Sequence, residues 1–402
     1  MTQINDPITL PCGQLINNRL AKAALTEGLG DQHNHATEGL ATLYRRWALG
    51  GTGLLLSGNI LVDRRYLERP GNVALSDESG LRALTRMVGA GQSNGTRFWA
   101  QLNHAGRQAT ASTSPEVLAP SAVRGSHMTA SQTIHVLSEA EIEQIVDAFA
   151  RTAQLAMTAG FDGVQVHAAH GYLVSSFLSP NVNQRSDRWG GDLVGRSRLL
   201  FAIVRRVRQS IGADKALAIK LNSADFQQGG FGEDDALRLI EQLNDEGIDC
   251  LEISGGTYET LGSRLWDGLG QGAAKASTQI REAYFLDFAR KATRISKMPL
   301  MLTGGFRTPQ AMNSALTHDG LSLIGIGRPL IAQPEVSADW LADQPGLSEQ
   351  RMGELSRFRI GWYYHAIRQL AAGLEPDFDI DQKVATKLTQ QADAAQAAGL
   401  VT

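Results

Sequence analysis

Two histidines and a tyrosine stand together in the stretch VHAAHGYL, at the end of an apolar run. The imidazoles of His167 and His170 can donate two N–H groups to one oxygen, which polarises a carbonyl group. Tyr172 is a weak acid that can deliver a proton nearby. A single histidine is most often structural, but this pair followed by a tyrosine indicates a catalytic site.

Two further polar residues close apolar runs. Gln101 ends the run TRFWAQL, and its amide offers a donor and an acceptor, which suits a heterocycle edge that carries N–H and C=O groups. Lys220, in ALAIKL, can supply a fixed positive charge beside a group that becomes anionic during turnover. The alternative for Lys220 is a side chain that extends into solvent.

Glycine-rich turns occur in LTGGF, with Gly304 and Gly305, and in IGIGRPL, with Gly327 and Arg328. Free backbone amides at the start of a helix bind anions, and glycine lets a ligand approach closely. Arg328 can add a bidentate contact to a phosphate. Turns need glycine in any case, so each pair alone is weak evidence. Together, after the last two predicted strands, they indicate a phosphate ligand.

Eight short apolar segments alternate with longer segments of helical periodicity. Most are bounded by Gly, Asp or Pro, as strands buried on both faces should be. With no internal break in composition, the pattern predicts an α/β fold, a closed (β/α)8 TIM barrel; an open doubly wound sheet is the alternative. The polar residues named above then gather at the C-terminal ends of the strands. The predicted strands are 18–25, 52–59, 96–102, 162–167, 216–221, 249–254, 299–304 and 321–326.

Helices are predicted between the strands. The segment 138–160 begins with Ser138 and Glu141, which form a capping box, and ends at Gly160. Similar signals mark three other predicted helices, at 76–91, 232–247 and 281–296.

Three additions to the barrel are expected. Residues 8–18 resemble a hairpin that closes the bottom of the barrel. The segment 104–138 is rich in Ser, Thr, Ala and Pro, and loops of this length usually cover an active site. The barrel domain is expected to span 1–345, and 346–402 to form a helical extension packed on or beside it, with a helix in 356–370.

Composition excludes several classes of protein. The 402 residues carry a net charge of −3, so a nucleic-acid or membrane-surface partner is not indicated. We find no apolar run of about 18 residues and no secretory leader, and therefore expect a cytoplasmic protein. Cys12 and Cys250 are the only cysteines, too few for an iron–sulfur cluster. The predicted strand ends are poor in carboxylates, which argues against a glycosidase.

A metal site is the rival use of the histidines. In a metal-dependent hydrolase on the same barrel, His33 and His35, or His104, would join His167 and His170 as metal ligands. No carboxylate is spaced as an obvious partner, and we therefore expect no metal.

The chain resembles the old yellow enzyme family of FMN-dependent ene-reductases, or NADH:flavin oxidoreductases. The resemblance covers about residues 7–334, and its most specific element is HAAHGYLVSSFLSPNVNQRSDRWGGDLVGRSRLL. The stretches NRLAKAALTE, AQLNHAGRQ, LTGGF and IGIGRPLIAQP support it in the expected order. Relatives with an iron–sulfur cluster need cysteines that this chain lacks.

The resemblance implies roles for individual residues. His167 and His170 would grip the substrate carbonyl, and Tyr172 would donate the proton. Lys220 stands where the family more often has arginine near flavin N1, which keeps the charge but loses the bidentate fork. The remaining implied FMN contacts are Ala24 and Thr26 of the first strand, Gly58 of the second, Gln101 at the pyrimidine edge, and Gly304, Gly305, Gly327 and Arg328 at the phosphate.

The implied reaction is ping-pong. NADH or NADPH would reduce tightly bound FMN and leave, and hydride would then pass to the β-carbon of an α,β-unsaturated carbonyl compound or related electrophile, with Tyr172 protonating the α-carbon. A flavin NADH oxidase without a dedicated alkene substrate is the alternative. The sequence does not distinguish NADH from NADPH, does not identify the substrate and leaves a homo-oligomer open.

Overall fold

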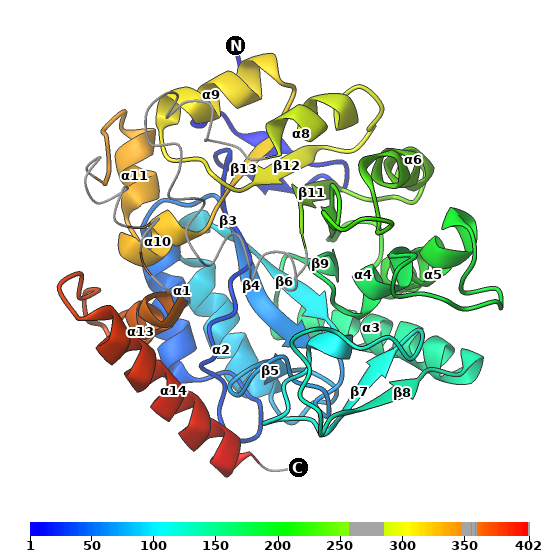
Figure 1. The fold of residues 1–402 in the computed structure, drawn as a ribbon. Helices are drawn as coiled ribbons and strands as arrows, with labels where there is room; N and C mark the ends of the chain where they lie inside the picture. Colours follow the sequence, from blue (N-terminus) through cyan, green and yellow to red (C-terminus); the bar gives the residue numbers. More distant parts are fainter. Residues whose placement is uncertain (257–284, 348–354, 356–357, 359, 401–402) are drawn as a thin grey trace.

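A computed structural model describes the chain except residues 257–284, 348–354, 356–357, 359 and 401–402. Eight parallel strands form a barrel surrounded by helices (Figure 1). The barrel is closed because β13 pairs with β3, and β3 in turn pairs with β4. This confirms the predicted (β/α)8 barrel and excludes the open sheet. The barrel strands are β3 (Leu20–Lys22), β4 (Leu54–Leu61), β6 (Arg97–Asn103), β9 (Gly163–Ala168), β10 (Ala216–Asn222), β11 (Cys250–Ser254), β12 (Leu300–Thr303) and β13 (Leu323–Ile326).

The lower half of the barrel interior is apolar, and a hairpin closes it. Strands β1 (Ile8–Thr9) and β2 (Leu15–Ile16) pair antiparallel, as predicted for residues 8–18. Leu10 and Ile16 pack against side chains inside the barrel, among them Trp99. The Trp99 indole N–H also donates to Gln14 Oε1 at 2.7 Å. With its lower end filled, the barrel can hold a ligand only at the opposite end, where the strands terminate in polar residues.

The helices follow the predicted signals. Helix α3 begins directly after Ser138, which forms the predicted capping box with Glu141. It ends before Gly160, whose φ of 98° favours glycine. The predicted helix 281–296 is shorter in the structure: α8 covers Leu286–Ala292, residues 293–296 are not helical, and residues 281–284 lie outside the described part of the chain. Around the barrel lie α1 (Glu38–Leu49), α2 (Leu81–Gly91), α3 (Glu139–Ala159), α4 (Leu173–Leu178), α5 (Leu193–Ile211), α6 (Glu233–Leu243), α8 (Leu286–Ala292), α9 (Pro309–His318), α10 (Arg328–Ala332) and α11 (Val336–Leu341).

The long segment after β6 has regular structure of its own. Within it, strands β7 (Glu116–Ala119) and β8 (Thr133–Val136) pair in parallel. Another short strand, β5 (Val73–Ala74), lies earlier in the chain and pairs with β4. Arg185, from the polar run after α4, donates to the carbonyl oxygens of Pro120 and Leu137 at 3.1 and 2.5 Å. The segment is therefore anchored to the barrel by the loop that follows α4.

Two helices follow the barrel. Helix α13 (Ile360–Ala371) packs against α1 and α10, and α14 (Gln382–Gly399) packs on α13 (Figure 1). Trp362 of α13 is buried, and its indole donates to the Asp377 carbonyl at 2.8 Å. Part of the predicted helix 356–370 lies outside the described residues, and the domain boundary at residue 345 stays a prediction.

Candidate functional site

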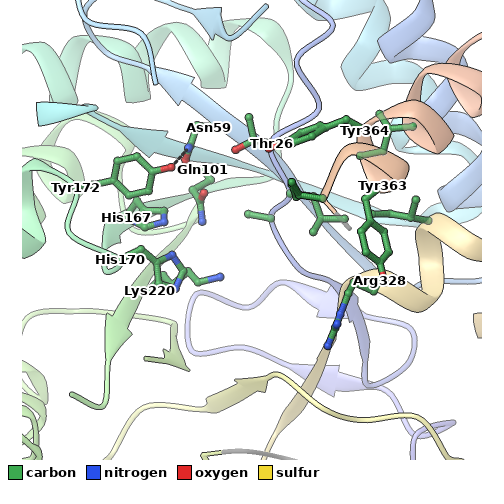
Figure 2. A pocket seen from close by; sticks show the side chains of 15 residues that line it. Thr26, Asn59, Gln101, His167, His170, Tyr172, Lys220, Arg328, Tyr363 and Tyr364 are labelled. Atoms are coloured by element: carbon green, nitrogen blue, oxygen red, sulfur yellow. Dashed lines mark hydrogen bonds between the residues drawn. The ribbon is translucent and has the colours of Figure 1, made fainter. Parts of the chain in front are cut away.

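A cavity of about 260 Å³ opens at the C-terminal ends of the barrel strands. Polar side chains of β9 and β10 lie on one side of it, and those of α10 and α13 on the other (Figure 2). Eight of the site residues expected from the sequence line it, and these are Ala24, Thr26, Gln101, His167, His170, Tyr172, Lys220 and Arg328.

The two histidines lie at one wall of the cavity, His167 buried and His170 partly exposed. His167 is the penultimate residue of β9, and its Nδ1 accepts the Ala169 backbone N–H at 3.4 Å, which leaves the proton of the neutral ring on Nε2. His170 Nε2 lies 2.8 Å from Ser254 Oγ, and the two imidazole centroids are 5.1 Å apart. Burial and the charge of Lys220 hold the pKa of both histidines well below the ordinary value. Neutral His167 can therefore donate its Nε2–H to a carbonyl oxygen. Neutral His170 can donate from Nδ1 in the tautomer whose Nε2 accepts from Ser254.

Tyr172 lies beside this pair. Its ring packs edge-on against His167 with centroids 4.6 Å apart, and its hydroxyl accepts a hydrogen bond from Asn59 Nδ2 at 3.1 Å (Figure 2). Asn59 Nδ2 also donates to Glu68 Oε2 at 2.7 Å, and Thr26 Oγ1 donates to the same oxygen at 3.0 Å. The tyrosine hydroxyl is thus part of a buried polar network that reaches across the cavity wall.

Asn59, and not Gly58, faces the cavity. The register between β4 and β6 shifts between Leu56 and Asn59, so the alternation of the strand reverses at this point. Gly58 instead donates its N–H to Glu27 Oε1 at 3.0 Å. A Cβ atom at Gly58 would lie 2.0 Å from Glu27 Oε2, which explains the glycine without a cofactor.

Gln101 and Lys220 are held from below by a chain of buried side chains. Gln101 Nε2 donates to Gln165 Oε1, and Gln165 Nε2 donates to Glu252 Oε2, both at 2.8 Å. Glu252 Oε1 forms an ion pair with Lys220 Nζ at 2.9 Å. These contacts fix the Gln101 amide with one N–H bonded to Gln165. The Lys220 cation lies at the cavity wall, and the buried Glu252 carboxylate is its counter-ion.

Arg328 lies at the far end of the cavity from the histidines (Figure 2). Burial raises the pKa of the neighbouring Tyr363 to about 12, although the Arg328 charge acts in the opposite direction. Gly304 and Gly305 follow β12 with φ values of 126° and 93°, which favour glycine. Neither these two nor Gly327 is among the lining residues, so their role as a phosphate cradle stays a prediction.

Helix α13 supplies the cavity wall that the sequence assigned to the loop after β6. Tyr363 and Tyr364 of this helix line the cavity, and among the described residues the segment 105–138 contributes none. The guanidinium of Arg69 lies 3.5 Å from the centroid of the Tyr364 ring. Arg69 in turn contacts both oxygens of Asp393 in α14, at 2.7 and 2.6 Å. The extension therefore forms part of the site.

The polar residues of the site that were not expected from the sequence include Asn59, Glu68, Tyr363 and Tyr364. Asn59 was the detectable one, because it is polar within the apolar run LLLSGNIL. Glu68 follows β4 in an irregular segment, and the tyrosines lie beyond the β/α pattern, so no periodic signal marks them.

The histidines of the metal alternative do not gather around His167 and His170. The rings of His33 and His35 stack at 5.8 Å outside the cavity. His104 is buried with its Nδ1 accepting the Gly106 N–H at 3.0 Å, and burial lowers its pKa to about 4. In the described part of the chain, no three potential metal-binding side chains form a group. Within the same residues, every helix is too short or too polar to cross a bilayer.

Comparisons with known proteins agree with the barrel and its cavity. A family model described as the NADH:flavin oxidoreductase / NADH oxidase family matches residues 3–340. An NADH-dependent flavin oxidoreductase of Hypocrea jecorina is 36% identical over 351 residues, 82% of this chain and 86% of that protein. Another, of Talaromyces variabilis, is 34% identical over 350 residues, 81% and 83% of the two chains.

A solved structure gives the same result. The old yellow enzyme homologue of Zymomonas mobilis is similar with a TM-score of 0.72 and 26% identity, over 86% of this chain and 94% of that one. The fold and the site therefore define a flavin-dependent oxidoreductase on a (β/α)8 barrel. The chain belongs to the NADH:flavin oxidoreductase / NADH oxidase family and is of the old yellow enzyme type.

Proposed function

We propose that this protein is an FMN-dependent ene-reductase that uses NADH to reduce the activated C=C bond of α,β-unsaturated carbonyl compounds. The observation that carries this proposal is the neutral histidine pair beside Tyr172, facing the cavity that Gln101 and Lys220 also line. Two uncharged N–H donors and a phenol suit a neutral carbonyl substrate that receives hydride and then a proton.

The residues present fit FMN. Gln101 retains an amide oxygen and a second N–H for the pyrimidine edge of the flavin, because only one N–H is used by Gln165. Lys220 supplies positive charge beside it, and Arg328 supplies positive charge at the opposite end for the phosphate. Thr26 donates its hydroxyl hydrogen to Glu68, so a hydrogen bond from Thr26 to the flavin would compete with that contact.

When bound, FMN would supply the chemistry of hydride transfer between NADH and the substrate double bond. His167 and His170 bind the carbonyl oxygen, where negative charge grows as the hydride arrives, and stabilise it. Tyr172 gives its phenol proton to the α-carbon. The apolar wall of Leu25, Ile331 and Ile367 excludes water from the reacting groups.

A flavin NADH oxidase is the second candidate. The family description itself includes NADH oxidases, and bound flavin alone does not separate the two activities. To test this, the protein is first reduced with NADH under anaerobic conditions. It is then mixed either with anaerobic cyclohex-2-enone or with oxygenated buffer, and flavin reoxidation is followed. Rapid reoxidation by the enone supports the ene-reductase; reoxidation by oxygen and by none of a panel of activated alkenes supports the oxidase.

A further inference from the structure

The buried side chains of Asn59 and Glu68 connect the cavity wall to Tyr172, which is buried as well. Asn59, Glu68 and Tyr172 are 6%, 7% and 1% exposed, and they come from β4, from the segment after it and from the turn after β9. We propose that Asn59 and Glu68 are positioning residues for proton transfer: Glu68 orients the Asn59 amide, and that amide holds the phenol oxygen of Tyr172. This inference rests on the proposed function, because it assigns Tyr172 the role of proton donor.

Glu68 determines which end of the Asn59 amide faces the tyrosine. The amide nitrogen of Asn59 lies 3.1 Å from the Tyr172 hydroxyl (Figure 2). It also lies 2.7 Å from Glu68 Oε2, so one NH₂ group serves both oxygens. Rotating the amide by half a turn would bring its oxygen against the Glu68 carboxylate, which is repulsive. Glu68 itself is held by Thr26, which donates to both of its oxygens at 3.2 and 3.0 Å.

The direction of the Asn59 bond matters for chemistry. Asn59 donates, so it occupies a lone pair of the phenol oxygen and does not use the phenol hydrogen. During turnover the O–H bond of Tyr172 breaks and a C–H bond forms at the α-carbon. The phenolate that remains keeps the hydrogen bond from Asn59 and later regains a proton from water. A donor aimed at the developing phenolate accelerates the step that forms it.

The two residues are expected to affect the pH dependence in opposite directions. Titratable groups that line the same cavity as Tyr172 include His167, His170, Lys220, Arg328, Tyr363 and Tyr364, and Glu68 is bonded to Asn59. Burial keeps the pKa of both histidines well below the ordinary value, and Lys220 is unchanged when Asn59 or Glu68 is replaced. Asn59 favours the phenolate, whereas the negative charge of Glu68 disfavours it.

The experiment compares Asn59→Leu and Glu68→Gln with the wild-type holoprotein. Each protein is reduced anaerobically and mixed with cyclohex-2-enone between about pH 6 and 10, across the range where phenols begin to ionise. We expect Asn59→Leu to slow reoxidation about five- to tenfold and to move the alkaline decline of the rate up by about half to one pH unit, the effect of one lost hydrogen bond. We expect Glu68→Gln to move the decline down.

The controls separate positioning from general damage. Thr152→Val removes a buried hydrogen bond of α3 to the Leu75 carbonyl, away from the cavity, and should leave both the rate and the profile unchanged. Reduction by NADH should stay within about twofold in all variants, since the proton donor does not act in that step. Equal losses in both half-reactions, unchanged profiles, or shifts of the same sign in both variants would overturn the inference.

A second readout does not depend on an alkene substrate. The ionisation of Tyr172 can be followed by ¹³C NMR of tyrosine Cζ, with Tyr172→Phe used to assign the signal. Opposite displacements of this titration in Asn59→Leu and Glu68→Gln support the inference even if the wild-type protein fails to reduce any enone. Coincident titrations in all three proteins contradict it, whatever the activity of the enzyme.

Discussion

The imidazole of His167 meets the ring of Tyr172 edge to face, with centroids 4.6 Å apart. The proposed hydrogen-bond donor for a carbonyl oxygen and the proposed proton donor are therefore neighbours on one wall of the cavity. This arrangement suits the proposed substrates, in which a single atom separates the carbonyl oxygen from the α-carbon.

Replacing Tyr172 with phenylalanine should separate the two half-reactions. The variant keeps the ring that packs on His167 but loses the acid, and general acid catalysis typically contributes about 10²–10⁴-fold. We expect enone-dependent reoxidation to slow within that range, while reduction by NADH changes little. Stopped-flow measurement of each half-reaction checks this, and an equal fall in both would show that Tyr172 is not the proton donor.

The histidine pair should not titrate in its ordinary range. Burial lowers the pKa of both side chains, so they stay neutral as the pH falls through about 6.5, the unperturbed value for histidine. Substrate binding should therefore show no inflection there. The unfolded chain does bind those protons, so the free energy of unfolding should decrease as the pH falls below about 6.5.

Denaturant titrations at several pH values, together with enone affinity at each, measure both effects. His104 contributes to the same acid destabilisation, since its pKa in the fold is about 4. His104→Gln therefore serves as a control that should reduce the pH slope of stability between about pH 4 and 6.5 without altering enone affinity. An inflection in enone affinity near pH 6.5 would contradict the neutral pair.

The link between the C-terminal extension and the site can be tested at Asp393. This carboxylate contacts Arg69, which stacks on Tyr364 of the cavity wall. Arg69 is 9% exposed and Asp393 28%, so we expect Asp393→Ala to cost about 1–3 kcal/mol and to raise the KM for the enone. The exposed pair of Arg290 and Asp287 provides the control, because Asp287→Ala should cost below about 1 kcal/mol.

Thermal unfolding and steady-state kinetics measure the two effects of the Asp393 variant. A variant with the wild-type KM would show that the extension does not shape substrate binding.

Gly58 should tolerate no side chain. A Cβ atom there would lie 2.0 Å from the Glu27 carboxylate and 2.4 Å from the Leu25 carbonyl, so Gly58→Ala should destabilise by about 1–3 kcal/mol or more. The matched control is Gly89→Ala in α2. A Cβ atom there would meet nothing within 4 Å, so this variant should be more stable to unfolding by about 0.5–1 kcal/mol. Equal stability of both variants, measured by denaturant unfolding, would show that the close packing around Gly58 is wrong.

Gly58 and Asn59 illustrate what the sequence could and could not predict. The barrel was predictable because its strands are buried on both faces and read as short apolar runs, and its strand ends led to His167, Gln101 and Lys220. The bulge in β4 reverses the side-chain alternation after Leu56, and no local pattern announces it. Gly58 was therefore expected at the flavin, whereas Asn59 lines the cavity.

The polar run after α4 is informative in another way. It is the second part of the most specific stretch of the family resemblance, which begins at His167, yet its residues mainly build a loop. The Asn183 amide donates to the carbonyls of Phe177 and Trp189, both at 2.8 Å, and Arg185 pairs with Asp187. A motif can thus identify the family through residues that support the site from outside. Tyr363 and Tyr364 escaped prediction because they reach the cavity only through tertiary packing of α13.

The most direct test of the central claim is an anaerobic titration of the purified protein with a phenol, followed by visible spectroscopy. We predict a yellow protein, and a new long-wavelength charge-transfer band as the phenolate binds beside the histidines over the flavin. The band should weaken strongly in His167→Ala and His170→Ala. A colourless protein, or a yellow one whose spectrum no phenol alters, would contradict a flavin facing this histidine pair.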